Sequence, residues 1–335
     1  MRFIVRLCQN KCRISFLSRL LSGSLGVLHV AVGVIKNQRG DVLISKRADD
    51  AHQGGLWEFP GGKLELGESS KQALTRELRE ELGITVQAAT QLIQIKHRYR
   101  ELSVCLDVYI VASFKGDERG MEGQPIKWVA ISDLKDYTFP VANLAIIEAL
   151  TLPTYYPIID ASIGDEQAML THLDELIARG YTLFQLRAKS FSKGEYKSLA
   201  DKAIKTCREK GVRLFVNASI NEALEMGAEG VHLSASEMMT AKEMTSLPDG
   251  LVFAASCHNQ KDLQVANELG VLFAVLSPVC KTKTHIDVEP LGWKQFECLV
   301  NQAWLPVFAL GGLGPKDISQ AQSSGAYGVA GIRAF

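Results

Sequence analysis

The sequence has little of what marks several protein classes. Its seven cysteines are scattered and form no CxxC pair, which argues against a disulfide framework and against a cysteine zinc site. No apolar run reaches the length of a membrane span. The 37 basic and 37 acidic residues cancel, so bulk electrostatic attraction to nucleic acid is not expected. We therefore predict a cytoplasmic protein that neither spans a membrane nor binds DNA directly.

The 335 residues are enough for two globular domains at about 100–200 residues each. A hydrophobic share of 47% and a charged share of 22% are typical of a soluble protein with an ordinary core. Residues 1–27 differ, because they carry several basic residues and no acidic one. These basic residues interrupt any apolar stretch of a secretory signal. We expect a disordered extension, an artefact of an upstream start codon, a targeting peptide or a docking helix.

Residues 28–150 read as one mixed unit of strands and helices. Leu28–Ile35 is apolar and β-branched, and the turn Asn37–Asp41 leads to Asp41–Arg47, which we interpret as its hairpin partner. Ser69–Leu82 has helical spacing of its apolar residues, and Gly83 is a natural C-cap. Further strands are expected at residues 86–97, 102–114 and 125–131, and a second helix at residues 143–150. A mixed sheet is predicted for this unit.

Residues 151–154 are predicted to be a linker, after which the pattern of apolar and polar residues changes. Eight apolar strand-like runs alternate with amphipathic stretches through residues 155–335. Eight βα repeats predict a parallel (β/α)8 barrel, although about 180 residues is short for that architecture. The expected strands are 155–159, 182–186, 212–216, 230–233, 251–255, 272–276, 305–310 and 328–332. The fold class is therefore α/β and α+β, in two domains.

Three glutamates stand on one face of the first predicted helix. Glu77, Glu80 and Glu81 are spaced i, i+3 and i+4, so their carboxylates repel each other unless a cation lies between them. Hard oxygen ligands suit Mg²⁺ or Mn²⁺, and Mg²⁺ commonly shares its coordination with substrate phosphates. The preceding Phe59–Gly62 turn can bring backbone close to such a site, since glycine has no Cβ. A solvated acidic face, with Arg76 as partner, is the alternative interpretation.

The frame around these glutamates is more specific than the glutamates alone. Gly62 is followed after five residues by Glu68, and then by Arg76–Ile84 with its closing Gly-Ile pair. The segment matches every position of the Nudix box and resembles the Nudix hydrolases, which act on a nucleoside diphosphate linked to another moiety. Flanking runs extend the resemblance, over about residues 28–150, to the MutT branch of 8-oxo-dGTP diphosphatases. These runs are Lys46–His52, Trp57–Lys63, Glu122–Pro125 and Phe139–Asn143.

This resemblance implies an α/β/α sandwich with a metal site. By position, Glu77, Glu80, Glu81 and the carbonyl of Gly61 would hold Mg²⁺ or Mn²⁺, and Glu122 would complete the ligand set. Water activated by the metals would attack the β-phosphorus in line, releasing a nucleoside monophosphate and pyrophosphate. The proton would go to a carboxylate, and Glu77, Glu80 and Glu122 are all open as the general base.

The same resemblance assigns four residues to the nucleotide. Asn143 would read the guanine-like edge of the base, for which an amide offers both a donor and an acceptor. Phe59 would contact the base through its backbone, and Arg47 and Arg100 would contact the nucleotide. Asn143 also stands at the start of the 143–150 helix, where it is suited to be the N-cap, and both roles are compatible.

Residues 155–335 resemble the thiamine-phosphate synthase and TenI superfamily. The matching runs are 185–189, 227–233, 256–258, 277–283 and 310–313. Most of them follow predicted strands, where barrel active sites lie. Backbone N–H groups of the glycine pair can cradle a phosphate, and lysines can compensate its charge. The expected site for a thiamine-type phosphate consists of Arg187, Lys189, His258, Lys283, Gly311 and Gly312.

The barrel departs from the synthase pattern where magnesium ligands would stand. An Asn-Asp-Arg run of the family is replaced by Asn217–Ser219, and a Gly-Gln-Asp-like run by Ser234–Glu237. Three interpretations are open for this half. It is a synthase, a TenI-like thiazole tautomerase with His258 as the acid–base group, or a barrel that binds a thiamine-type phosphate without turnover or serves structurally. His232 is interpreted as structural.

Three hypotheses follow for the whole chain. The leading one is a Mg²⁺-dependent 8-oxo-dGTP diphosphatase that prevents mutagenic incorporation, fused to a barrel of the thiamine-pathway type. The second keeps the Nudix chemistry and makes a thiamine-related diphosphate the substrate. The third makes the barrel a ligand-sensing module that regulates the hydrolase.

Overall fold

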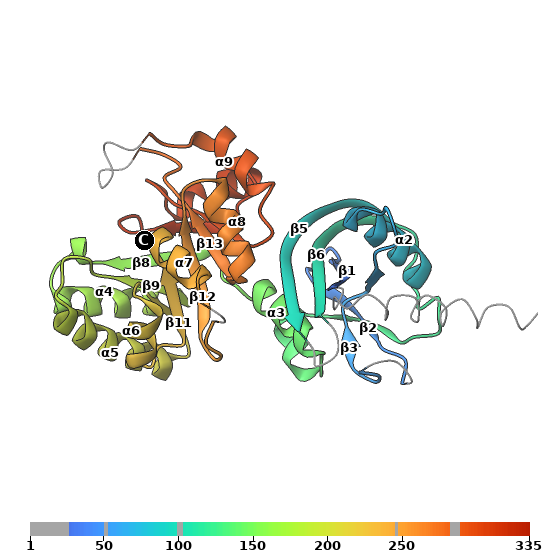
Figure 1. Ribbon diagram of the computed structural model, residues 1–335, viewed down its shortest axis with the longest axis horizontal. Helices are drawn as coiled ribbons and strands as arrows, with labels where there is room; N and C mark the ends of the chain where they lie inside the picture. The colour runs from blue at the N-terminus through green and yellow to red at the C-terminus, as the bar shows by residue number, and fades with distance from the viewer. Residues whose placement is uncertain (1–26, 50–52, 99–102, 245–246, 282–288) are drawn as a thin grey trace, which may run out of the picture.

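A computed structural model describes residues 27–49, 53–98, 103–244, 247–281 and 289–335 of the chain. Figure 1 shows two bodies side by side, a sheet-based body from the first part of the chain and a barrel from the second. Among the described residues, none of the helices combines the length and the apolar character needed to cross a bilayer. The predicted extension 1–27 lies outside the described residues except for Val27.

The first body is built on two sheets. One has the strand order β4-β1-β6-β5 and the other the order β3-β2-β7. The strands are β1 (Val27–Ile35), β2 (Val42–Lys46), β3 (Trp57–Glu58), β4 (Gly61–Lys63), β5 (Thr85–Arg98), β6 (Ser103–Lys115) and β7 (Ile126–Val129). The helices are α2 (Ser70–Leu82) and α3 (Val141–Leu150), with a 3-10 turn η1 (Ile131–Asp136) before α3. Strand β1 pairs parallel with β6 and antiparallel with β4, so this sheet is mixed, as predicted.

The layers follow from the alternation of side chains along β1. Ala31 and Ile35 point to one face and belong to the core beneath α2. Val32 and Val34 point to the other face and belong to the core shared with α3. Both faces of the mixed sheet are thus covered by a helix, which agrees with the expected α/β/α sandwich.

Two local predictions for the first body are wrong. β1 and β2 are not hairpin partners, because after the turn at Asn37–Asp41 they enter different sheets and share only the isolated bridge between Lys36 and Val42. Helix α3 begins at Val141 with Pro140 as its N-cap, so Asn143 lies inside the first turn and is not the cap. The Oδ1 of Asn143 accepts the N–H of Phe59 instead of an N–H of its own helix.

The second body is a closed barrel of eight parallel strands in the order β10-β11-β12-β13-β14-β15-β8-β9. All eight predicted strands are present with small shifts at their ends. They are β8 (Tyr155–Asp160), β9 (Leu183–Arg187), β10 (Arg213–Val216), β11 (Gly230–Leu233), β12 (Val252–Cys257), β13 (Phe273–Leu276), β14 (Val307–Ala309) and β15 (Gly328–Gly331). The helices are α4 (Glu166–Ala178), α5 (Lys193–Lys210), α6 (Ile220–Glu225), α7 (Ala235–Lys242), α8 (Gln260–Leu269), α9 (Gly292–Val300) and α10 (Ile318–Ser323), with 3-10 turns η2 (Ala161–Ile163) and η3 (Pro315–Asp317).

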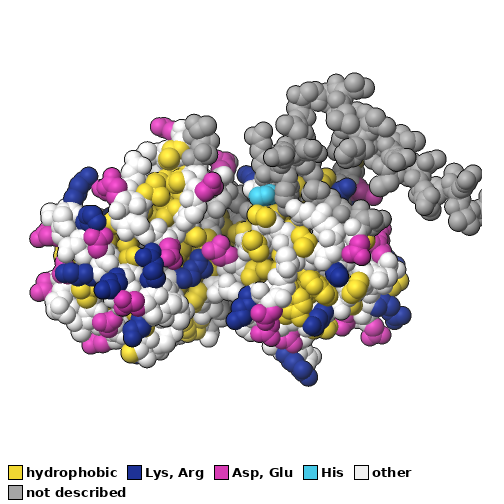
Figure 2. All heavy atoms as spheres, turned by 90° about the horizontal axis from the view of Figure 1, so that it is seen from below, with side chains coloured by type: hydrophobic (Ala, Val, Ile, Leu, Met, Phe, Trp, Pro, Cys, Tyr) yellow, Lys and Arg dark blue, Asp and Glu magenta, His cyan; other side chains and the backbone are white. Residues whose placement is uncertain are grey.

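The two bodies contact each other through the N-terminal end of the barrel. Gln94 of β5 donates its backbone N–H to the carbonyl of Trp304 at 2.8 Å, and the Trp304 ring packs edge-on against Tyr109. Figure 1 shows α3 at this junction, and Figure 2 shows the barrel and the sheet-based body packed against each other, on the left and the right of the view. One apolar core runs from α3 into the barrel interior, where it includes Tyr156 and Phe308.

Candidate active site

Helix α2 places a row of carboxylates beside the strand β4. Ser69 and Gln72 form a reciprocal capping box at its start, and Gly83 ends it in the left-handed conformation. Leu74 and Leu78 are fully buried against the sheet, which fixes how the helix is turned. The glutamates on the neighbouring face therefore lie over the Phe59–Gly62 turn.

Arg76 joins two of these carboxylates to that of Glu68, which precedes the helix. Its guanidinium is 2.8 Å from Glu77, 3.2 Å from Glu80 and 2.9 Å from Glu68. The same group donates to the carbonyl of Lys63 at 2.9 Å, which ties the helix to the end of β4. Glu77 is nearly buried, whereas the Glu80 side chain is 59% exposed. Burial raises the pKa of Glu77, and the charge of Arg76 opposes that shift.

Glu81 is the most perturbed carboxyl of the site. Burial raises the pKa of Glu81 to about 8, and the charges of Glu58, Glu77 and Glu122 raise it as well. The N–H of Gly61 donates to Oε2 of Glu81 at 3.1 Å and opposes this shift. The charges of three other carboxyl groups thus act on Glu81, and this repulsion favours a cation nearby.

The glycines of the turn are required by close packing. A Cβ at Gly62 would overlap the carboxyl group of Glu77. Gly61 has a φ of +148° and lies against the backbone of Ala31, so a side chain would be excluded there as well. The backbone of residues 61 and 62 consequently lies in direct contact with the carboxylates of α2, as the sequence predicted.

Glu122 reaches the site on the loop between β6 and β7. Gln124 holds this loop, since its Oε1 accepts from the N–H of Glu122 at 2.9 Å and its Nε2 donates to the carbonyl of Glu81 at 3.0 Å. The N–H of Met121 donates to the same carbonyl at 2.9 Å. One turn of α2 and a loop forty residues later are therefore joined by the backbone of Glu81.

The donor chemistry of this cluster fits a hard divalent cation. All its side-chain donors are carboxylate oxygens, which Mg²⁺ and Mn²⁺ prefer, and two of them, Glu77 and Glu81, are largely withdrawn from water. Within the described residues, no three acidic, histidine or cysteine side chains are gathered into a ready-made ligand set. Two of the proposed ligands, Glu77 and Glu80, are instead held in ion pairs with Arg76.

The predicted base site lies at the other end of the same turn. Oδ1 of Asn143 accepts the backbone N–H of Phe59 at 3.3 Å, and both side chains are buried. The Phe59 ring stacks on Phe139 with centroids 5.6 Å apart. Because Oδ1 is held in this way, the Nδ2 group of Asn143 is oriented by the backbone of Phe59.

Of the two arginines predicted to contact the nucleotide, the structure describes one. Arg47 forms an ion pair with Glu58 on the neighbouring strand β3. Burial raises the pKa of Glu58, and Arg47 opposes that shift. Arg100 lies outside the described residues.

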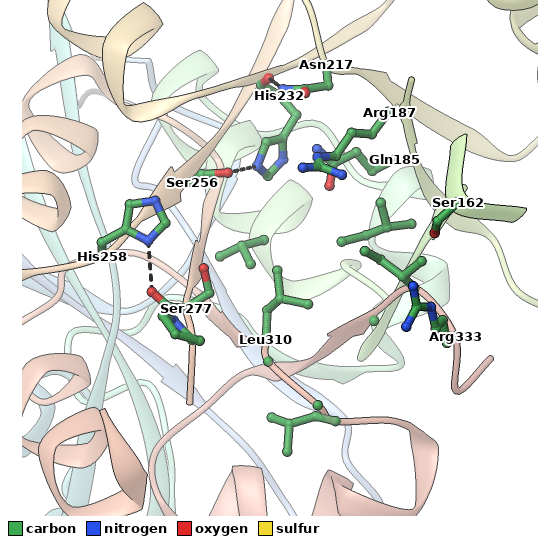
Figure 3. Close-up of a pocket in the computed structure, with 18 of the residues that line it drawn as sticks. Ser162, Gln185, Arg187, Asn217, His232, Ser256, His258, Ser277, Leu310 and Arg333 are labelled. Carbon is green, nitrogen blue, oxygen red and sulfur yellow. Dashed lines mark hydrogen bonds between the residues drawn. The ribbon is translucent and has the colours of Figure 1, made fainter. Parts of the chain in front are cut away.

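The barrel holds a cavity of about 470 Å³ at the C-terminal ends of its strands. Figure 3 shows the side chains that line it, with His232, Arg187 and Ser256 on one side and Leu310 and Arg333 on the other. The described lining residues include cations but neither aspartate nor glutamate. These cations are Arg187, Lys189, Lys281 and Arg333.

Five of the six predicted barrel residues line this cavity, namely Arg187, Lys189, His258, Gly311 and Gly312. The sixth, Lys283, lies outside the described residues. Gly311 and Gly312 have φ values of +124° and +68°, conformations that favour glycine. Arg187 is paired with Asp160, the last residue of β8. Burial alone would raise the pKa of Asp160, but hydrogen bonds from Ser162 and Arg187 hold it below its ordinary value.

The two histidines of the cavity differ. Nδ1 of His258 lies 2.8 Å from the carbonyl of Ser277 and donates to it. His232 is buried between the Tyr156 hydroxyl at 3.1 Å and the Ser256 hydroxyl at 2.9 Å. Burial lowers the pKa of His232 to about 3, so it is neutral at physiological pH. This geometry fits the structural role predicted for His232.

Sequence reasoning did not single out three residues that the structure brings to these sites. Glu58 and Gln124 lie inside the runs that carry the Nudix resemblance, so their place in the sequence could have identified them as site residues. Arg333 comes from the last residues of the chain, where no motif marks it.

The family comparisons divide the chain at the same place as its fold. Residues 31–149 match the family model described as NUDIX domain, and residues 155–335 match the model described as thiamine monophosphate synthase. Nudix hydrolases generally use divalent metal ions.

Individual relatives agree with both matches. The 8-oxo-dGTP diphosphatase of Escherichia coli is 39% identical over 123 residues, which are 37% of this chain and 95% of that protein. The CTP pyrophosphohydrolase of the same organism is 37% identical over 121 residues, 35% of this chain and 87% of that protein. The thiamine-phosphate synthase of Methanococcus maripaludis is 27% identical over 181 residues, 54% of this chain and 86% of that protein.

Proposed function

Since the chain belongs to the Nudix hydrolase family through its first domain and to the thiamine monophosphate synthase family through its second, we propose that it hydrolyses 8-oxo-dGTP. The products are 8-oxo-dGMP and pyrophosphate. Mg²⁺ is the proposed metal, and removal of the oxidised nucleotide before DNA synthesis is the proposed role. The domains are residues 28–150 and 155–335.

The observation that carries this proposal is the short turn from Phe59 to Gly61. At one end, the N–H of Phe59 is bonded to Asn143, and at the other, the N–H of Gly61 is bonded to Glu81. Two residues of extended chain span at most about 7 Å. The amide proposed to bind the base, that of Asn143, and the carboxylate of Glu81, proposed to bind the metal, are therefore held at a fixed distance by one short backbone segment.

The residues of the chain would act as follows. Glu77, Glu80, Glu81, Glu122 and the carbonyl of Gly61 would hold the metal. Bound Mg²⁺ would neutralise the triphosphate and lower the pKa of an attacking water. The nearby carboxylates Glu77, Glu80 and Glu122 would supply the proton acceptor. Asn143 would orient the base through Nδ2, and Phe59 would offer its backbone.

Measurement of kcat/KM on a nucleotide panel tests this function. We expect 8-oxo-dGTP to exceed dGTP and CTP by at least about a hundredfold, because a buried amide penalises a base that leaves its hydrogen bonds unmade. Hydroxymethylpyrimidine diphosphate is included because the barrel belongs to a thiamine-related family. Asn143→Ala should remove the preference while preserving hydrolysis. A preference for CTP or for the pyrimidine diphosphate would overturn the substrate assignment.

We further propose that the barrel binds a thiamine-type phosphate and does not carry out the synthase reaction. The described lining supplies Lys189, Lys281 and Arg333 for the phosphate but no carboxylate for magnesium. Thiamine phosphate should therefore bind equally well with and without EDTA in calorimetry. Lys281→Ala should weaken binding about tenfold, whereas the exposed Lys193→Ala should not. Binding that requires Mg²⁺, or synthase turnover, would contradict this proposal.

A further inference from the structure

The barrel contributes a cap to the helix that carries Asn143. The hydroxyl of Tyr327 lies 2.8 Å from the carbonyl oxygen of Leu152 and 3.2 Å from that of Ala149. Ala149 belongs to the last turn of α3, where carbonyl groups have no partner within the helix. That turn contains no basic side chain of its own. Tyr327 therefore satisfies backbone groups that α3 leaves open.

Tyr327 is well suited to this role. It directly precedes β15, at the end of the barrel opposite to the cavity mouth. Its ring packs against Phe308, with centroids 5.7 Å apart, so the phenol is held from the barrel side. Burial raises the pKa of Tyr327 to about 12, which keeps the hydroxyl protonated as a donor.

A second polar contact holds the same turn of α3. Arg213, the first residue of β10, lies 2.7 Å from the carboxylate of Glu148. The apolar side of the turn is buried too, since Ala149 and Leu150 belong to the core that continues into the barrel. The C-terminal turn of α3 is thus held on its polar and apolar sides by the second domain.

Helix geometry connects this contact to the base site. Asn143 stands six residues before Ala149, about 9 Å along the same helix axis. A hydrogen-bonded helix transmits a shift of its end to its other residues as a nearly rigid rod. The bond between Asn143 and Phe59 is 3.3 Å, so a small displacement is enough to lose it.

We propose that Tyr327 is a positioning residue for base recognition, through which the barrel holds α3 so that Asn143 faces the nucleotide. This inference rests on the proposed role of Asn143 in the hydrolase. The second domain would then help to set the nucleotide specificity of the first domain. Tyr327 is a positioning residue and not a catalytic one, because its hydroxyl contacts the backbone carbonyls of Ala149 and Leu152 and not the proposed nucleotide site.

The test is Tyr327→Phe in the full chain, which removes the hydroxyl and keeps the ring. We expect KM for 8-oxo-dGTP to rise about threefold to tenfold, as for the net loss of one hydrogen bond, with kcat changed less than about twofold. The preference over dGTP should fall by a similar factor. Glu148→Gln should change KM in the same direction by a smaller factor.

Tyr196→Phe is the matched control. Its hydroxyl also donates to a backbone carbonyl, that of Leu186 at 3.0 Å, but inside the barrel. Both variants should lower the melting temperature, and only Tyr327→Phe should change nucleotide selectivity. A lower melting temperature with unchanged KM and selectivity would overturn the inference, and so would an equal effect of both variants.

The same data separate this inference from the proposed function. If Asn143→Ala changes selectivity and Tyr327→Phe does not, the substrate assignment stands and the positioning role fails. If the wild type prefers another nucleotide of the panel, the substrate assignment fails. The KM comparison then uses that nucleotide, and an unchanged KM in Tyr327→Phe would still overturn the positioning role.

Discussion

The α2 face and the barrel cavity differ in the sign of the charge that each one gathers. At Glu81, burial raises the pKa of the carboxyl most, and the charges of Glu58, Glu77 and Glu122 raise it further. The described lining of the barrel instead gathers lysines and arginines without an acid. The first arrangement calls for a cation between protein and polyphosphate, whereas the second suits direct contact with a phosphate. The two proposed phosphate sites would therefore use opposite charges within one chain.

The largest expected effect is that of Glu81→Gln, which tests whether the α2 face depends on a cation while the barrel cavity does not. The substitution keeps the shape of the side chain but removes a proposed metal ligand, so we expect kcat for 8-oxo-dGTP to fall at least about a hundredfold at saturating Mg²⁺. Thiamine phosphate affinity in the barrel should not change. Glu65→Gln, at an exposed position before α2, is the control. Unchanged turnover in Glu81→Gln would contradict the metal assignment.

A smaller effect is expected in the pH dependence of stability without divalent metal. The pKa of Glu81 is raised from 4.5 to about 8, so the folded state holds this proton more tightly than the unfolded state. The contribution of Glu81 to the free energy of unfolding should therefore be fully present below about pH 4.5 and fall by a few kcal/mol as the pH rises to about 8.

The comparison for this prediction is between the wild type and Glu81→Gln in urea unfolding followed over that pH range. The difference in stability between them should favour Glu81→Gln increasingly toward pH 8, because the amide does not ionise. Addition of Mg²⁺ should recover stability in the wild type alone. A pH-independent difference would contradict the burial of a carboxyl with a raised pKa at this position.

The barrel strands could be predicted because each is a short apolar run between amphipathic helices, a pattern that depends on local residues. The position of α2 could be predicted for the same reason, since Ser69 and Gly83 mark its ends. The pairing of β1 could not, because its partners β4 and β6 are distant in sequence while the local turn suggested β2. Non-local pairing leaves no signature in the turn itself.

The candidate site shows the same division. The glutamates of α2 and the glycines of the turn were visible as a spaced motif, and the structure brings them into contact. The support of α3 by Tyr327 was not, because the contact joins residues more than 170 positions apart and involves backbone oxygens. A tyrosine before a strand has no pattern that distinguishes a cap on another domain from ordinary packing.

The contact of the first domain with the N-terminal end of the barrel affects how a small molecule could move between the two candidate sites. The barrel cavity opens at the C-terminal ends of the strands, so its mouth faces away from the hydrolase. A compound released at the proposed nucleotide site would therefore reach the mouth of the cavity through solvent. The fusion would then provide equal numbers of the two domains in a fixed arrangement, and not a channel between their sites.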